Sequence, residues 1–205
     1  MKSQTLSPAF FRRPDVVQVA RELLGMLLVT EVEGERTTGR IVETEAYAAN
    51  DKASHAHRAR RTTRTEPMFA DGGMAYVYLC YGIHHLFNVS TNISGVAEAV
   101  LVRAVEPVEG EDIMSRRRGL QPGNFRLTAG PGALTQALGI GRQHNAQPLP
   151  QREVWFEDDG FQLVEKSIIA GTRVGVGYAG EDAYLPYRFW ISGNRWVSRA
   201  KGLRR

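Results

Sequence analysis

The sequence predicts a single domain of the α+β class, and three observations lead to this prediction. Many short segments have the composition of strands, whereas only a few show the apolar spacing of helices. The 205 residues contain no internal repeat, no low-complexity segment and no clear linker. A hydrophobic content of 42% is enough for one sizeable core. We therefore expect residues 1–205 to form one domain, with residues 1–9 and 200–205 as flexible ends.

The helices are predicted from apolar spacing and from the residues that begin and end a helix. Residues 14–24 place valine, alanine and leucine on one helical face, with Pro14 in the first turn and Gly25 after the last. Residues 130–139 form a second short helix, opened by proline and closed by glycine. Residues 111–126 are expected to form a helix followed by a loop.

Strands are predicted where β-branched and aromatic residues run between turn residues. The segment 98–105 is almost wholly apolar and reads as a central strand that Pro107 ends. Tyr81-Gly82 marks the tip of a protruding hairpin between strands at 74–80 and 86–90. The other predicted strands are residues 26–32, 39–47, 153–156, 162–165, 172–176 and 188–191. Residues 48–67 form a long polar loop, and loops of that length in compact domains are usually functional or disordered.

The positive charge of the chain resides almost entirely in arginine. The net charge is +4, and only four of the 26 basic residues are lysines. Arginine is favoured where phosphates are held by paired hydrogen bonds. The basic residues form three clusters: Arg58, Arg60, Arg61 and Arg64; Arg116, Arg117 and Arg118; and Lys201, Arg204 and Arg205. Each cluster alone could be solvated surface, but the three together favour a polyanionic partner.

Several classes of protein are disfavoured by what the sequence lacks. No apolar run approaches the ~18 residues of a membrane span, and the N-terminus lacks the apolar core of a secretory signal. A single cysteine, Cys80, excludes an intrachain disulfide and favours a reducing compartment. There is no Gly-x-Ser-x-Gly elbow and no P-loop. Nucleophilic and nucleotide-driven chemistry therefore have little support.

The most informative segment is residues 39–47, which places two carboxylates in a strand. Strand alternation puts Ile41, Glu43, Glu45 and Tyr47 on one face. A carboxylate buried there is unfavourable unless it is paired or used. Arg103 interrupts an apolar strand and needs a buried anionic partner, for which the two glutamates are candidates. A carboxylate held by an arginine stays ionised, as a base that activates water must. The alternative is an ion pair without catalytic duty.

Aromatic residues surround this carboxylate in the sequence. Tyr47, His55 and Tyr78 could stack on a planar base, which is worth ~1–3 kcal/mol per base. For Tyr76, on the same face as Tyr78, ordinary core packing is the favoured interpretation. Tyr81 precedes a glycine at the predicted turn tip and should be exposed. Exposed wedges of this kind slip between base steps in proteins that bend DNA.

The histidines raise the question of a metal site. His55, His57 and the pair His84-His85 could combine with Glu43, Glu45 and Asp51 in a hydrolytic centre. However, the chain has no His-x-x-x-His pair, no Asp-x-Asp and no Cys-x-x-Cys. We therefore expect no metal and no organic cofactor. A metal-dependent nuclease and a non-catalytic DNA-binding protein remain as alternatives.

Taken together, these residues resemble the alkyladenine (3-methyladenine) DNA glycosylase family over most of the chain. The motifs that carry the resemblance are Gly39-Arg-Ile-Val-Glu-Thr-Glu-Ala-Tyr47, Tyr76-Val-Tyr-Leu-Cys-Tyr-Gly82 with Asn88-Val-Ser90, Leu101-Val-Arg-Ala-Val-Glu-Pro107, Gly130-Pro-Gly-Ala-Leu134, Arg173-Val-Gly-Val-Gly177 and Arg188-Phe-Trp190. The resemblance implies a curved antiparallel sheet surrounded by helices. It also implies a monomeric, monofunctional repair enzyme for double-stranded DNA.

The resemblance also implies a reaction and a set of roles. Such an enzyme flips out alkylated or deaminated purines, such as 3-methyladenine, hypoxanthine and ethenoadenine, and hydrolyses the N-glycosidic bond. It would be cytoplasmic and associated with the nucleoid in a bacterium, or nuclear in a eukaryote. By position, Glu45 is the general base and Arg103 helps to hold the water. The base pocket comprises Tyr47, His55, Tyr78 and Asn88, with Asn88 screening against normal guanine; Tyr81 is the wedge, and Arg58, Arg60, Arg61 and Arg64 are expected to contact the DNA backbone.

Overall fold

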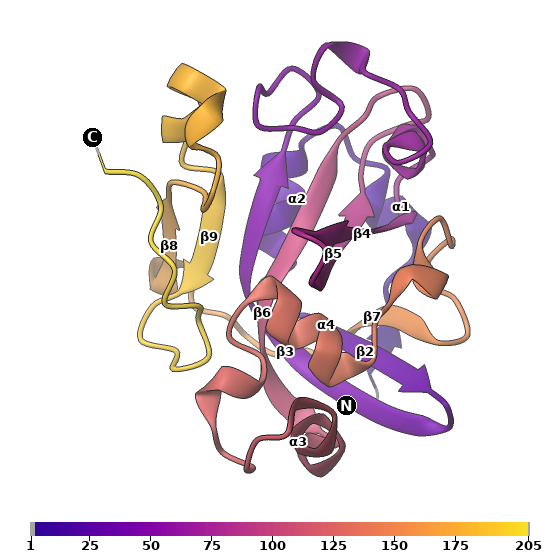
Figure 1. The fold of residues 1–205 in the computed structure, drawn as a ribbon, viewed down its shortest axis with the longest axis vertical. Coiled ribbons are helices and arrows are strands. Elements are labelled where there is room, and N and C mark those ends of the chain that lie inside the picture. The colour runs from indigo at the N-terminus through magenta and orange to yellow at the C-terminus, as the bar shows by residue number, and fades with distance from the viewer. Residues whose placement is uncertain (1–2, 205) are drawn as a thin grey trace.

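The computed structural model describes residues 3–204 and confirms the α+β class. Figure 1 shows β4 and β5 in the middle of the view, β8 and β9 to their left, and α3 and α4 below them. The strands are β1 Gln4–Thr5, β2 Leu27–Val32, β3 Glu35–Tyr47, β4 Ala75–Cys80, β5 His84–Ser90, β6 Ala99–Glu109, β7 Val154–Asp158, β8 Ile168–Gly171 and β9 Arg188–Ile191. The α-helices are α1 Pro8–Phe11, α2 Val16–Glu22, α3 Glu111–Arg118 and α4 Pro131–Leu138.

The nine strands form one antiparallel sheet, in which seven follow the order β1-β7-β2-β3-β6-β5-β4, β9 pairs with β3, and β8 pairs with β9. The long strand β3 changes partners along its length: residues 35–40 pair with β2, whereas residues 43–45 pair with β9. On its other side β3 pairs with β6. The second half of β3 is thus enclosed by strands on both sides, which places its side chains in the interior.

The helices α2, α3 and α4 pack against the sheet in its main core, and short 3-10 turns occupy the connections. Apolar residues of α2, α3 and α4 join one core cluster with β3, β5 and β6. Asp15 caps α2 by accepting the Gln18 backbone N–H, and Pro131 opens α4 as predicted. The 3-10 turns are η1 His57–Ala59, η2 Glu66–Phe69, η3 Phe125–Leu127, η4 Arg142–His144, η5 Glu165–Ser167 and η6 Gly177–Tyr184.

Two predicted strands are wrong, and a third runs further than expected. Residues 162–164 are irregular and Glu165 begins η5, whereas residues 172–176 are irregular because they bond to side chains of the site rather than to a strand. Pro107 does not end its strand, because it lies beside Gly39 at an irregularity where proline is tolerated. As for the expected flexible ends, residues 1–2 and 205 lie outside the described residues, and Gln4–Thr5 pair with β7.

Register shifts beside Glu43 correct the predicted face of β3. In the pairing of β3 with β6, Val42 on β3 and Arg103 on β6 have no partner in the register. Such bulges redirect side chains, often beside functional sites. Ile41 therefore packs in the main core rather than on the face of the two glutamates, while Val42 packs in a separate cluster with Ala104.

Candidate active site

Two glutamates of β3 lie fully buried where β6 and β9 flank the strand. Glu43 and Glu45 are both 0% exposed, so neither is solvated from outside. They are separated by one residue and face the same side of the strand, as predicted. Buried carboxylates need donors for each oxygen. The donors come from β3 itself, β6, β9 and the two segments at residues 172–176 and 196–203.

Glu43 is held by two arginines and one serine. Its Oε1 accepts Arg103 Nε at 2.7 Å, Arg188 Nε at 2.8 Å and the Ser198 hydroxyl at 2.9 Å. Its Oε2 accepts the Ser198 backbone N–H at 2.8 Å. With this many charge-assisted donors, Glu43 is a structural anchor for Arg103.

Glu45 has fewer donors, and each comes from a wall of the same cleft. Its Oε1 accepts the Val174 backbone N–H at 2.8 Å and lies 3.2 Å from Arg103 Nη1. Its Oε2 accepts the Tyr47 hydroxyl at 2.8 Å. The sequence left open which acid pairs with Arg103, and the structure shows that both do. Burial opposes the charge of Arg103, but the two carboxylates offset it and raise its pKa.

A cleft of about 710 Å³ lies beside this carboxylate, although Glu45 itself is not among its lining residues. The predicted residues Tyr47, His55, Tyr78, Asn88, Arg103 and Tyr81 all line it, together with the first turn of α4 and residues 174–176. Glu45 lies directly behind Tyr47, Arg103 and Val174, which all line the cleft and bond to it. The cleft lies mostly against apolar and aromatic surface, with few polar groups, which suits a planar organic ligand.

Three aromatic rings form one wall of the cleft. His55 packs edge-on against Tyr78 at 4.8 Å between centroids, and Tyr76 lies 5.2 Å from Tyr78. His55 Nδ1 is 2.8 Å from the Tyr76 hydroxyl. Burial, followed by the charge of Arg64, lowers the pKa of His55 to about 4, so the ring is neutral at physiological pH. Tyr76 is 2% exposed within a core cluster, consistent with the packing role that we favoured for it.

The tip of the β4–β5 hairpin carries the exposed aromatic that the sequence predicted. Tyr81 is 92% exposed, and its φ of 50° lies in the left-handed region beside Gly82 at 71°. Ile83 on the same tip is 72% exposed. Tyr81 also lines the cleft, so an exposed aromatic side chain borders it.

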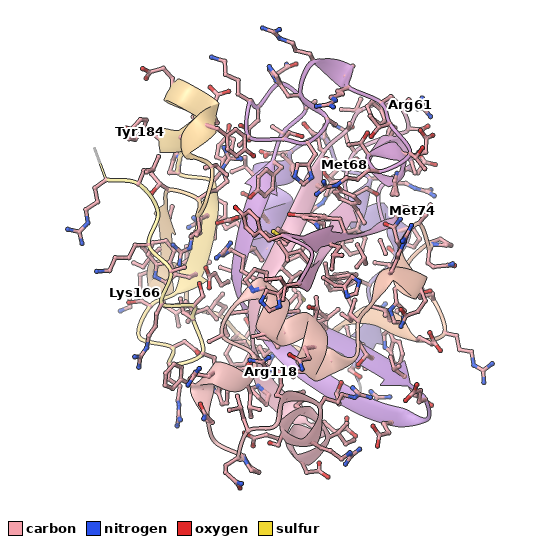
Figure 2. All side chains as sticks on the ribbon, viewed as in Figure 1. Arg61, Met68, Met74, Arg118, Lys166 and Tyr184 are labelled. Atoms are coloured by element: carbon pink, nitrogen blue, oxygen red, sulfur yellow. The ribbon has the colours of Figure 1, made fainter. Side chains whose placement is uncertain are left out.

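The four loop arginines differ in their surroundings. Arg64 lines the cleft and lies 4.6 Å over the Tyr78 ring. Arg61 is paired with Glu66, its Nη2 lying 2.5 Å from Oε1, and Figure 2 shows Arg61 at the upper right, farther out than the cleft residue Met68. Arg58 and Arg60 are exposed and form no ion pair with any described residue. Their free charges suit phosphate contacts.

The histidines are not gathered with acids into a ligand set. Within residues 3–204 no group of three or more His, Cys, Asp or Glu side chains is placed to hold a metal ion. Asp51, considered above as a ligand, instead pairs with the fully buried Arg173. The described part of the chain also contains no helix that is long and apolar enough to cross a membrane.

Sequence reasoning missed several residues that hold the site together. Arg173 bonds to Asp51, Ala46 O and Asp182 O, and Arg188 and Ser198 hold Glu43. The signal that identified Arg103, an arginine inside an apolar strand, was also present at Arg188 in Arg188-Phe-Trp-Ile. No local pattern marks Ser198 or the Val174 N–H, because their partners lie more than a hundred residues away.

The site combines a buried acid behind an aromatic cleft with an exposed tyrosine at the edge of the cleft, an arrangement that suits hydrolysis at a nucleic-acid base. The comparisons define the class of protein as a DNA glycosylase of DNA repair. The family model of methylpurine-DNA glycosylase (MPG) matches residues 9–195, and the chain belongs to this family.

Relatives described as candidate 3-methyladenine DNA glycosylases match along nearly the whole chain. One from Myxococcus xanthus is 48% identical over 195 residues, covering 95% of this chain and 93% of the relative. One from Carboxydothermus hydrogenoformans is 45% identical, with 95% and 99% covered, and one from Chlamydia felis is 44% identical, with 91% and 96% covered. The resemblance seen in the sequence is therefore confirmed.

Proposed function

We propose that this DNA glycosylase flips an alkylated or deaminated purine into the cleft and hydrolyses its N-glycosidic bond with water activated by Glu45. The substrates would be of the 3-methyladenine, hypoxanthine and ethenoadenine class. The observation that carries the proposal is the placement of the Glu45 carboxylate, fully buried, behind three residues that line one cleft. We propose that the protein acts as a monomer, because the residues assigned to the base pocket converge on one cleft within a single chain.

Glu45 acts as the general base of the reaction. The water proton passes to its carboxylate as the water oxygen bonds to the anomeric carbon; the glycosidic bond breaks, and its electron pair leaves with the purine. The negative charge also stabilises the positive charge that develops on the sugar. Arg103 Nη1 lies 3.2 Å from the carboxylate and borders the cleft, where it would help to place the water.

The cleft walls would select the base by stacking and by shape. Tyr47 and the rings of His55 and Tyr78 offer aromatic surface to a planar purine. A purine alkylated on a ring nitrogen is cationic and leaves without protonation, and aromatic faces attract such a cation. Asn88 is held by the bond from its Nδ2 to Tyr76 O at 3.0 Å, so its amide would crowd the amino group of guanine.

Flipping requires that something fill the space the nucleotide leaves. Tyr81 is exposed on a projecting hairpin at the cleft mouth, which is where a wedge of this kind would act. The exposed arginines Arg58, Arg60 and Arg64, with Arg61 at their side, would hold the phosphates of the distorted strand.

The test is excision from duplexes that carry one hypoxanthine, ethenoadenine or 3-methyladenine, followed by alkaline cleavage at the abasic site. Glu45→Gln should lower the single-turnover rate by roughly 10³-fold or more while lesion binding persists, because the amide cannot accept a proton as the carboxylate does. Glu31→Gln, the same change on an exposed residue of β2, is the matched control. Full activity in Glu45→Gln removes this residue from the role.

A chelator separates this proposal from a metal-dependent nuclease. The glycosylase should release free base at an unchanged rate in excess EDTA and leave the backbone intact before alkali. Strand cleavage that needs a divalent cation and precedes alkali would instead support the nuclease.

A further inference from the structure

The last described segment of the chain runs beside both buried acids. Residues 196–203, which we call the C-terminal strap, lie beyond the family-model match that ends at residue 195. The strap has no helix or strand, yet Trp196 and Ser198 are only 7% and 8% exposed. An irregular segment buried in this way must be held by specific contacts.

The strap is anchored at both ends. Trp196 packs in a cluster with Val42, the bulged residue of β3, and with Ala104 of β6. At the other end, the Thr172 hydroxyl donates to Leu203 O at 2.7 Å. Gly202 fits against Thr172 so closely that an added Cβ would lie 2.2 Å from the threonine Oγ1. Thr172 is two residues from Val174, whose N–H binds Glu45.

Ser198, between these anchors, grips both oxygens of Glu43. Its hydroxyl donates to Oε1 at 2.9 Å and its backbone N–H donates to Oε2 at 2.8 Å. The backbone N–H is the donor found for Oε2 among the described residues, and the hydroxyl adds the side-chain bond that holds Oε1 to the same residue. Glu43 Oε1 in turn receives Arg103 Nε, which leaves Arg103 Nη1 directed at Glu45.

We propose that Ser198 is a positioning residue of the glycosylase reaction, acting through Glu43 to orient Arg103 toward Glu45 and the attacking water. The inference rests on the proposed role of Glu45. Ser198 itself is not among the residues that line the cleft. Two arginines converge on Glu43 Oε1, so this oxygen could shift toward Arg188 if the bond from the serine hydroxyl were removed. Arg103 would then lose the fixed partner that aims its second nitrogen at Glu45.

The test separates the chemical step from DNA binding. In single-turnover excision with saturating enzyme, Ser198→Ala should lower the rate roughly 3- to 10-fold, the size expected for one lost hydrogen bond of ordinary strength, because Glu43 Oε1 keeps two arginine donors. The affinity for lesion duplex should be unchanged. Ser198→Thr keeps the hydroxyl and should restore most of the rate. Ser192→Ala, on an exposed serine of the turn after β9, is the control and should match the wild type.

The outcomes distinguish this inference from the proposed function. A wild-type rate in Ser198→Ala beside an inactive Glu45→Gln overturns the role of Ser198 alone. The role of Ser198 is also overturned if Ser198→Thr loses as much of the excision rate as Ser198→Ala, or if Ser198→Ala weakens only the affinity for DNA. If Glu45→Gln is active, the general base is another residue, and both the proposed function of Glu45 and the role of Ser198 are wrong.

Discussion

The Tyr47 hydroxyl donates to Glu45 Oε2 at 2.8 Å, from two residues along the same strand. Burial raises the pKa of Tyr47 well above its ordinary value, with the Glu45 charge adding to the effect, so the hydroxyl remains a donor across the working pH range. Glu45 Oε1 is already engaged by the Val174 N–H and faces Arg103. On the proposed mechanism, Oε2 is therefore the oxygen with capacity to accept the water proton.

Tyr81→Ala should impair flipping without harming the fold. The side chain is 92% exposed, so its loss should change the free energy of unfolding by less than about 0.5 kcal/mol. Excision from duplex DNA should fall at least tenfold, because nothing then fills the gap in the stack, while excision from single strands is spared. Comparing both substrates measures this, and equal losses on the two would refute the wedge.

The loop arginines should differ in their effect on salt dependence. Arg58→Ala and Arg60→Ala should each reduce the slope of log affinity against log salt by about 1, as expected for one lost phosphate contact. Arg61→Ala is the internal comparison and should change the slope less, because Glu66 already neutralises it. Fluorescence anisotropy of a labelled duplex at several salt concentrations gives the slopes. If the slopes of Arg58→Ala and Arg60→Ala match the slope of the wild type, the phosphate contacts lie elsewhere.

The sequence predicted most of the fold because its strands and helices carry local signals. The hairpin with Tyr81 at its tip, β9 at residues 188–191 and the α4 helix follow from alternation, turn residues and capping proline. Segments 162–165 and 172–176 were misjudged because apolar composition also arises where irregular chain packs on a core. Leu163, for example, packs on the main core without joining the sheet.

The site was predictable where one residue conflicted with its surroundings. Glu45 and Arg103 are charged residues within apolar strands, and this contrast with their neighbours predicted that both are buried and paired. The bulges at Val42 and Arg103 leave no such mark, because a register shift depends on the partner strand. Ser198 looks like any polar residue near the end of a chain, and only the fold brings it to Glu43.

Asp51→Ala should destabilise the protein strongly. Arg173 is 0% exposed, and Asp51 is its carboxylate partner, so the variant leaves a buried charge without compensation. Losses for such broken pairs are about 3–5 kcal/mol. Glu109→Ala, which removes the exposed partner of Arg36, should lose less than about 1 kcal/mol. Urea unfolding compares the two, and similar losses in both would contradict the structural importance of the buried pair.

His55 should make the stability of the fold depend on pH below neutrality. Burial, with the charge of Arg64 second, lowers the pKa of His55 from 6.5 to about 4. Between these two values the unfolded chain binds a proton at this position and the folded chain does not. The free energy of unfolding therefore falls as pH decreases from about 6.5 to about 4, and the contribution of His55 is constant outside that window. The full effect is roughly 3 kcal/mol.

The measurement is the free energy of unfolding for the wild type and His55→Gln at pH 7.5 and pH 4. Glutamine does not titrate, so the stability of the wild type relative to the variant should drop by roughly 3 kcal/mol between these conditions. His84→Gln, on the exposed first residue of β5, serves as the control for losing a histidine. A difference between wild type and His55→Gln that is the same at both pH values would mean that the folded protein protonates His55 as readily as the unfolded chain does. The neutral ring proposed for the base pocket would then be wrong under acidic conditions.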